Sequence, residues 1–315
     1  MNTQLTSVAI PALSGTGTGE CPLVLGECVQ GRLENGPDFL ITLPIHLCSR
    51  AEFTIDPALE QVVVTPPDRL KARAAVSRYL AESGLPSGGR LHIETPVRPS
   101  LGFGTSTADI TASLRAAAAA WERTLEPDEI SRRAVAIEPS DGSMYPGSVA
   151  YALRLGQVLE RFGPLPPLVA LVVVTGDGVD TLAFDQQREH FRYSPEEHQQ
   201  LETAWGLVRQ ACQQRSLALL GRATTLSARL HQRLLPNAWL QELERCAPEV
   251  GAAGVSVAHS GSLASMLLDP SAADFPQVRE RARRELERIA PGGWIEVSGC
   301  PQPEAEQAAV LEASP

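Results

Sequence analysis

Hydrophobic and polar residues alternate in several short runs over the first hundred positions of the chain. Such alternation is typical of β-strands with one buried face, and it predicts strands at residues 23–28, 39–43, 47–55 and 90–95. Asn35-Gly36-Pro37-Asp38 predicts a turn between the first two strands. Residues 68–83 repeat apolar positions at helical spacing, after two prolines and before Gly84, and predict a helix.

The middle of the chain continues this mixed pattern. A helix is predicted to run through Ile110 and the alanines that end at Ala120, because alanine has the highest helix propensity. A second helix opens at Pro127 and ends near Ile137, since proline is favoured in a first helical turn. Residues 149–153 and 157–161 then predict a hairpin.

A proline-rich stretch at residues 164–167 is the best candidate for a linker. The apolar, β-branched run at residues 168–175 is typical of a strand buried on both faces. Beyond it the pattern predicts helices at residues 194–214, 216–232, 238–246 and 275–289, and strands at residues 255–259, 263–268 and 294–298. We therefore expect one domain at residues 1–163, a second at residues 168–300, and a disordered tail at residues 301–315.

Composition narrows the class of protein. The 315 residues are 43% hydrophobic and 20% charged, as expected of a globular protein of enzyme size. The formal net charge of −10 argues against nucleic acid as a partner, because neutralising phosphates requires a basic face. No apolar run approaches the roughly 20 residues that span a bilayer, and the first residues lack the basic stretch followed by an apolar one that is typical of a signal peptide. We expect a cytoplasmic protein that does not bind membranes.

Six cysteines occur without the C-x-x-C spacing of zinc sites or redox motifs, and we expect them to be reduced thiols rather than a disulfide framework. Lys71 is the only lysine in the sequence, and no glycine loop precedes it. A Walker A loop is thereby excluded, and a Schiff base at any other position as well. We expect any phosphate chemistry to use backbone amides, arginines and a metal.

The strongest local signal is a glycine-rich turn, residues 99–104, that leads directly into the alanine-rich helix. Gly102 and Gly104 allow positive φ angles and a close approach of the backbone to a ligand. The unpaired N–H groups of a first helical turn form an anion site. The hydroxyls of Thr105, Ser106 and Thr107 either cap this helix or turn toward a phosphate-bound Mg²⁺. Taken alone, the turn is equally well explained as an ordinary capped helix start.

Three further polar segments accompany this loop: Gly26-Glu27, the acidic pair Glu138 and Asp141, and Ser260-Gly261-Ser262. Phosphoryl transfer needs a backbone cradle, an acid and a hydroxyl that hold Mg²⁺, and a carboxylate that orients the attacking hydroxyl. Taken singly, Asp141 before Gly142 is more typical of a turn and Glu138 of a helix end. His259, between apolar residues, is more typical of a core histidine and is not counted as catalytic.

The segment Gly102-Phe103-Gly104-Thr105-Ser106-Thr107-Ala108 resembles the second motif of the GHMP kinase superfamily. The resemblance narrows to the L-threonine kinases of cobalamin biosynthesis. The strings that carry it are Cys21-Pro22, Gly26-Glu27, Gln30-Gly31, Ser106-Thr107-Ala108-Asp109-Ile110, Ile137-Glu138-Pro139-Ser140-Asp141 and Val257-Ala258-His259-Ser260-Gly261-Ser262. They are spread over about residues 20 to 270.

This resemblance implies an α+β fold of two domains, an N-terminal one with the phosphate loop and a C-terminal α/β plait of ferredoxin-like type. It implies that Glu138 and Ser106 hold Mg²⁺, that Asp141 is catalytic and that Glu27 contacts the substrate. The residues implied to bind ATP are Gly102, Phe103, Gly104, Thr105, Ser106, Thr107, Ser260 and Gly261.

The function implied is transfer of the γ-phosphoryl group of ATP to the hydroxyl of L-threonine, giving O-phospho-L-threonine for cobalamin biosynthesis. Two alternatives stay open. The first is the same chemistry on another small alcohol, such as L-serine or L-homoserine. The second is a nucleotide-binding protein without turnover. The partners expected are a small amino acid and ATP, and a homodimer is compatible with the sequence.

Overall fold

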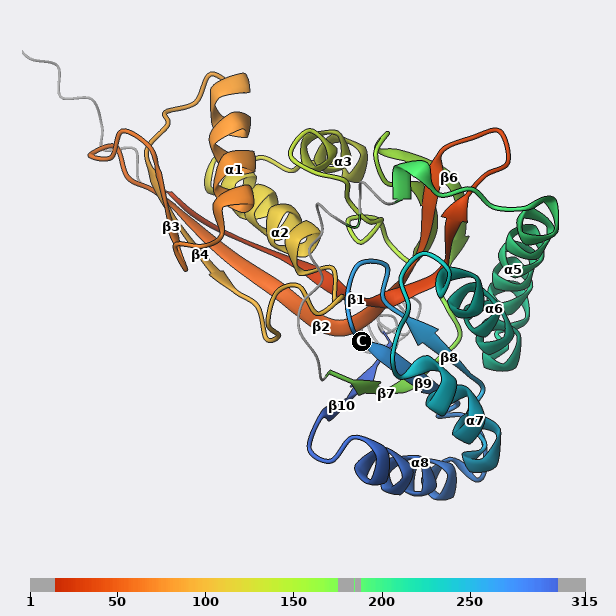
Figure 1. Cartoon of the computed structure of the whole chain (residues 1–315). Helices are drawn as coiled ribbons and strands as arrows, with labels where there is room; N and C mark the ends of the chain where they lie inside the picture. Colours follow the sequence, from red (N-terminus) through yellow and green to blue (C-terminus); the bar gives the residue numbers. More distant parts are fainter. Residues whose placement is uncertain (1–14, 175–183, 185–187, 300–315) are drawn as a thin grey trace, which may run out of the picture.

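The computed structural model describes residues 15–174, residue 184 and residues 188–299. Its largest element is a hairpin of two long antiparallel strands, β1 (Thr16–Arg32) and β2 (Asp38–Ile55), which curves through the molecule (Figure 1). β2 lies in a six-stranded sheet of order β3-β4-β2-β5-β6, with β1 also paired to β2. The other members are β3 (Val62–Thr65), β4 (Gly89–Glu94), β5 (Ser148–Ala152) and β6 (Gln157–Gly163).

Helices α1 (Leu70–Glu82), α2 (Thr105–Ala120) and α3 (Pro127–Val135) lie together beside the long hairpin (Figure 1). α2 is the central one, and thirteen of its sixteen residues are buried. Small residues let it approach β1 closely: a Cβ atom at Gly17 would lie 2.2 Å from the backbone nitrogen of Ala120, and one at Gly19 would lie 2.3 Å from the carbonyl oxygen of Ala112. This close packing places the N-terminus of α2 against the middle of the hairpin.

A second, antiparallel sheet has the order β10-β7-β9-β8. Its strands are β7 (Val169–Val173), β8 (Gly254–Val257), β9 (Ala264–Leu268) and β10 (Trp294–Ser298). The helices of this half are α5 (Pro195–Gln214), α6 (Leu217–His231), α7 (Leu240–Val250) and α8 (Phe275–Ile289). The sheet order and the crossing helices match the ferredoxin-like plait that the sequence led us to expect.

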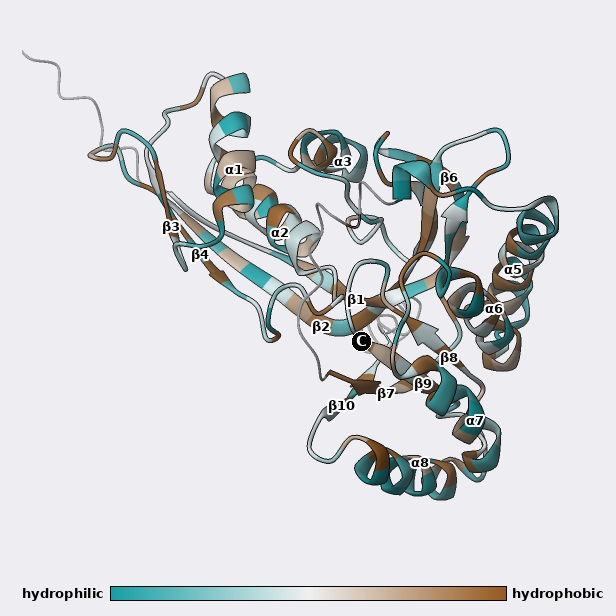
Figure 2. Cartoon of the chain, viewed as in Figure 1, coloured by the Kyte–Doolittle hydropathy of each residue, from teal (hydrophilic) through white to brown (hydrophobic). Residues whose placement is uncertain are grey.

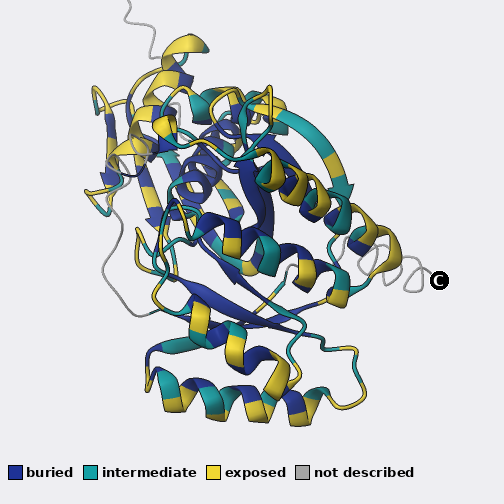
Figure 3. Cartoon of the chain, turned by 45° about the vertical axis from the view of Figure 1, so that its right-hand side comes forward, coloured by how far each residue is buried: buried dark blue, intermediate teal, exposed yellow. Residues whose placement is uncertain are grey.

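The second sheet separates two hydrophobic cores, as the burial of its strands suggests (Figure 3). Alternate residues of β7 belong to different cores: Ala170 and Val172 to the large one that includes the long hairpin, and Leu171 and Val173 to a smaller one with α7 and α8. The prediction of a strand buried on both faces is confirmed. The outer surface of α8 is hydrophilic (Figure 2), and its buried residues Val278, Ala282 and Leu286 recur every fourth position.

Most predicted elements are confirmed, with shifts at their ends, but two predictions are wrong and one strand was missed. Residues 39–43 and 47–55 are not two strands, because β2 continues through Pro44, which pairs with Val24 where the register is irregular. β3 was not predicted. α7 does not end at Cys246 but runs through Pro248 to Val250.

The linker candidate at residues 164–167 lies between the last strand of the first sheet and the first strand of the second. The predicted tail at residues 301–315 lies outside the described residues, as does residue 175 of a predicted strand. Within the part of the chain that is described, no helix is both long and apolar enough to cross a bilayer.

Candidate active site

A cavity of about 730 Å³ lies where the glycine-rich turn meets the start of α1, the segment before β5 and the turn after β8. Its wall includes nearly all the polar residues singled out above. They are Glu27, Gly102, Gly104, Thr105, Ser106, Thr107, Glu138, Asp141 and Ser260. Phe103 and Gly261, also implied to bind ATP, are not part of this wall. Segments far apart in the sequence therefore converge on one space.

The turn before α2 has the geometry of an anion cradle. Gly102 has φ 107° and Gly104, the N-cap residue of α2, has φ 63°. No side chain among the described residues caps α2, whose first backbone hydrogen bond runs from the Ala108 amide to the carbonyl of Gly104 at 3.1 Å. The amides of the first turn are therefore available to a phosphate, helped by the positive end of the helix dipole. Of the two readings left open for the loop hydroxyls, capping is excluded.

Ser106 and Glu138 meet at this end of α2. The Ser106 hydroxyl donates to one carboxylate oxygen of Glu138, and the ammonium group of Lys71 forms an ion pair with the other. The sequence argument excluded a Walker A lysine and gave Lys71 no place in the site, but α1 brings Lys71 into the cavity wall.

A hydroxyl beside a carboxylate is a donor set that suits Mg²⁺, which takes one or two protein oxygens together with substrate phosphates. Among the described residues, no group of three or more His, Cys, Asp or Glu side chains could hold a metal by itself. Ser106 and Glu138 therefore fit a metal that is shared with bound phosphates.

Asp141 is buried, with 6% of its surface exposed, and lies against the helix start. Its amide donates to the Thr107 hydroxyl at 3.3 Å, and its carboxylate accepts the Ser143 amide at 2.9 Å. A Cβ atom at Gly104 would lie 2.7 Å from its Oδ2 atom. Burial raises the pKa of the Asp141 carboxyl, although hydrogen bonding from Ser143 opposes the rise. Such a carboxyl is suited to take up a proton from a substrate hydroxyl.

Glu27 is the second buried carboxyl of the cavity, with 4% of its surface exposed. Its Oε2 atom has no hydrogen-bond partner among the described residues. Burial raises its pKa well above the ordinary value, the negative charge of Asp141 adds to this rise, and the charge of Arg188 opposes it. An unpaired buried carboxylate oxygen is costly unless a ligand satisfies it.

The turn after β8 packs against the glycine-rich turn. A Cβ atom at Gly261 would lie 2.4 Å from the Leu101 carbonyl oxygen and 2.5 Å from the Gly102 Cα atom, so only glycine fits there. The Leu263 amide donates to the same Leu101 carbonyl at 3.2 Å. Phe103 is fully buried behind the loop, and its carbonyl accepts the Val24 amide at 3.0 Å. Phe103 and Gly261 thus shape the cradle from behind, while Ser260 faces the cavity.

His259 lies at the edge of the cavity, in contact with a buried charged network. Its Nδ1 atom is 2.6 Å from the Gln30 side-chain oxygen, and the Arg188 guanidinium is 3.2 Å from the same nitrogen. Arg188 also lies 3.3 Å from the Asp38 carboxylate and donates to the Gly31 carbonyl at 3.0 Å. Burial and the charge of Arg188 hold the pKa of His259 well below its ordinary value. The imidazole is therefore neutral.

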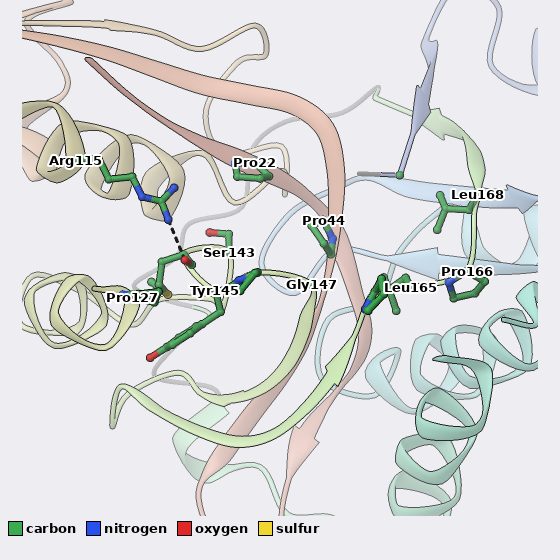
Figure 4. Close-up of a pocket in the computed structure, with 14 residues that line it drawn as sticks. Pro22, Pro44, Arg115, Pro127, Ser143, Tyr145, Gly147, Leu165, Pro166 and Leu168 are labelled. Atoms are coloured by element: carbon green, nitrogen blue, oxygen red, sulfur yellow. Dashed lines mark hydrogen bonds between the residues drawn. The ribbon is translucent and has the colours of Figure 1, made fainter. Parts of the chain in front are cut away.

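A second, smaller cavity of about 290 Å³ lies behind the turn that carries Asp141 (Figure 4). Prolines form much of its wall, together with Leu165 and Leu168. Arg115 points into it and donates to the Met144 carbonyl at 2.9 Å. Ser143 borders this cavity and also binds Asp141 through its amide. Arg115 and Ser143 thereby contact the segment that carries Asp141.

Comparison with known proteins agrees with this arrangement. The family model of the GHMP kinases N terminal domain matches residues 70–152, which include α1, the glycine-rich turn, α2 and Asp141. An L-threonine kinase of Salmonella typhimurium is 30% identical over 280 residues, covering 86% of this chain and 90% of that protein. The chain belongs to the GHMP kinases.

Two further relatives are consistent with that membership. An L-threonine kinase of Citrobacter freundii is 27% identical over 264 residues, covering 82% of this GHMP kinase and 89% of the relative. The crystal structure of a homoserine kinase from Cytophaga hutchinsonii superposes with a TM-score of 0.70 at 14% identity, covering 95% of this chain and 97% of that one. At that identity the likeness concerns the fold alone.

Sequence reasoning missed several residues of this GHMP kinase site. Arg69 lines the cavity and is anchored by Asp109 of α2, with 3.2 Å between the guanidinium and carboxylate atoms. Asp109 itself accepts hydrogen bonds of 2.6 Å from Ser49 and Thr95. The one available signal was that Asp109 stands in Ser106-Thr107-Ala108-Asp109-Ile110, one of the strings that carry the resemblance. Lys71 could have been noticed in the sequence because it is the only lysine in the chain.

Proposed function

We propose that this GHMP kinase transfers the γ-phosphoryl group of ATP to the side-chain hydroxyl of L-threonine, giving O-phospho-L-threonine for cobalamin biosynthesis in the cytoplasm. The observation that carries the chemistry is the position of Asp141. Its buried carboxyl lies directly against Gly104, the N-cap residue of α2 in the phosphate cradle. A substrate hydroxyl hydrogen-bonded to Asp141 is thereby held next to phosphates bound at the start of α2.

In this proposal the amides of the glycine-rich turn and of the first turn of α2 bind the ATP phosphates. Gly102, Gly104, Thr105, Ser106 and Thr107 form that part of the site. Phe103 and Gly261 support the cradle from behind, and Ser260 faces it. Backbone donors that are fixed before the substrate arrives stabilise negative charge without a cost of reorganisation. Such electrostatic stabilisation, together with positioning, accounts for most of the catalysis in phosphoryl transfer.

Ser106 and Glu138 would hold Mg²⁺, which supplies charge neutralisation at the phosphates. Asp141 orients the threonine hydroxyl and takes up its proton as the oxygen attacks. The buried Glu27, with its unpaired oxygen, would bind the amino group of the amino acid, because an ammonium group satisfies a buried carboxylate. These roles are supported by one shared cavity and by the resemblance to relatives that are L-threonine kinases.

The test is phosphoryl transfer from MgATP to L-threonine, with L-serine and L-homoserine measured in parallel. Asp141→Asn keeps the size of the side chain and removes the base. Asp56→Asn serves as the matched control, because Asp56 pairs with Arg90 at the surface, away from the cavity. We expect turnover selective for L-threonine that Asp141→Asn lowers by at least a factor of about 100, the contribution typical of a general base.

Turnover selective for another alcohol would support the proposed kinase activity but reject L-threonine as the substrate. Binding of MgATP without transfer to any of the three alcohols would reject the proposal in favour of a nucleotide-binding protein without turnover. Loss of activity in Asp56→Asn as well would mean that the effect is not specific to the Asp141 carboxyl.

A further inference from the structure

We infer that Lys71 is a phosphate-contacting cation of this site, held in readiness by Glu138. The inference rests on the proposed kinase function and extends it by one residue. Lys71 is the second residue of α1 and lies in the wall of the same cavity as the first turn of α2. Its ammonium group is paired with the carboxylate that also accepts the Ser106 hydroxyl. The amine is therefore adjacent to the amides expected to bind phosphate.

The other cations of the cavity wall are engaged differently. Arg69 is packed between two carboxylates, 3.2 Å from Asp109 and 3.6 Å from Asp68, and only 15% of its side chain is exposed. His259 is neutral at physiological pH for the reasons given above. The side chain of Lys71, by contrast, is 56% exposed. Among the described residues of the wall, Lys71 is thus the cation most open to the cavity.

The balance of charge in the cavity makes this cation important. The wall carries five carboxyl groups, those of Glu27, Asp68, Asp109, Glu138 and Asp141, against the guanidinium of Arg69 and the ammonium of Lys71. A triphosphate adds further negative charge to this surface, so a cation on the cavity side favours its binding.

Lysine suits such a task, because its ammonium group is a compact charge on a flexible stem and binds phosphate without a fixed geometry. The pairing with Glu138 keeps the ammonium group beside the first turn of α2 before a ligand arrives. Contact with the phosphate oxygens then requires only rotation of the side chain.

The single lysine makes a direct test simple, because an amine-acylating reagent has one ε-amino group to modify. Acylation of Lys71 is followed by mass spectrometry of its peptide, with any reactive α-amino group as an internal reference. A saturating, non-hydrolysable MgATP analogue is expected to slow acylation of Lys71 at least fivefold and to leave the reference unchanged. Equal acylation with and without bound nucleotide would overturn the inference.

Calorimetric binding to variants provides the second test. A hydrogen bond to a charged group contributes about 1.5–3 kcal/mol, so Lys71→Met should weaken binding of the MgATP analogue by roughly 10- to 100-fold. Binding of adenosine should stay within twofold, and Lys71→Arg should recover most of the affinity. Arg73→Met is the matched control, since it removes an exposed cation of the same helix outside the cavity wall.

The outcomes separate this inference from the function on which it rests. Failure of the wild-type protein to bind the nucleotide would reject the proposed function together with the role of Lys71. Tight binding of the nucleotide by Lys71→Met would reject the role of Lys71 alone. An equal loss of adenosine and nucleotide affinity would also reject it, since it would mean that Lys71 acts only through the structure of α1.

Discussion

Gly104→Ala tests whether the close approach of the phosphate cradle and Asp141 is required. Gly104 has φ 63°, and a left-handed conformation costs a residue with a Cβ atom about 1–2 kcal/mol. The added Cβ would also lie 2.6 Å from a methyl carbon of Val24 and 2.7 Å from the carboxylate of Asp141. Overpacking of this kind costs a further 1–3 kcal/mol or so. We expect a total loss of about 2–5 kcal/mol in the free energy of unfolding.

Gly84→Ala is the matched control for this experiment. Gly84 has φ 64°, but no described atom lies within 4 Å of a Cβ built there. It should therefore lose only about 1–2 kcal/mol, from the backbone conformation alone. Both variants are compared by urea denaturation and by turnover with MgATP and L-threonine.

Turnover should fall at least tenfold in Gly104→Ala, because a displacement of about 1 Å in a catalytic site can cost a factor of about 100. In Gly84→Ala turnover should stay near the wild-type value. Equal losses of unfolding free energy in the two variants, with full turnover in Gly104→Ala, would refute the argument.

Two further predictions concern buried charges. Because burial raises the pKa of Asp141, the folded protein holds this proton more tightly than the unfolded chain does, and wild-type stability is lost as the pH rises through the raised pKa. Asp141→Asn should thus be more stable than wild type at pH 8, with a gain that shrinks toward pH 4, and urea denaturation showing a less stable variant at pH 8 would contradict this. Arg188→Met breaks the buried ion pair with Asp38 and should lower the free energy of unfolding by about 3 kcal/mol. This value is near the low end for such a loss, because Arg32 still binds Asp38 in the variant. The exposed Arg192→Met should change the free energy of unfolding little, and similar denaturation midpoints for the two arginine variants would argue against a buried ion network.

The features that the sequence could predict are those with a local cause. The start of α2 follows from glycines that permit positive φ and from alanines that favour a helix, and both signals lie within twenty residues of each other. The strand β7 could be predicted as buried on both faces, since an unbroken apolar run needs a core on each side. The site residues Glu27, Glu138 and Asp141 came from resemblance, because their local sequence fits turns and helix ends equally well.

What could not be predicted depends on contacts between distant segments. Lys71 and Glu138 are 67 positions apart, and their pairing arises only because α1 packs beside α2. The partners of the loop hydroxyls could not be predicted either, because they are distant in sequence: Thr107 accepts a hydrogen bond from the Asp141 amide, and Ser106 donates to Glu138. Residues 39–43 and 47–55 were predicted as separate strands, but the irregular pairing of β1 and β2 accommodates Pro44, a residue without an N–H group.

The glycine and alanine contact between β1 and α2 has a consequence for how this fold diversifies. Any larger side chain at Gly17 or Gly19 would push the helix off the strand, so the cradle at its end can hardly drift in position over evolutionary time. We therefore expect substitutions to be tolerated more readily in the segments that bring Glu27 and His259 to the cavity than at Gly17 or Gly19.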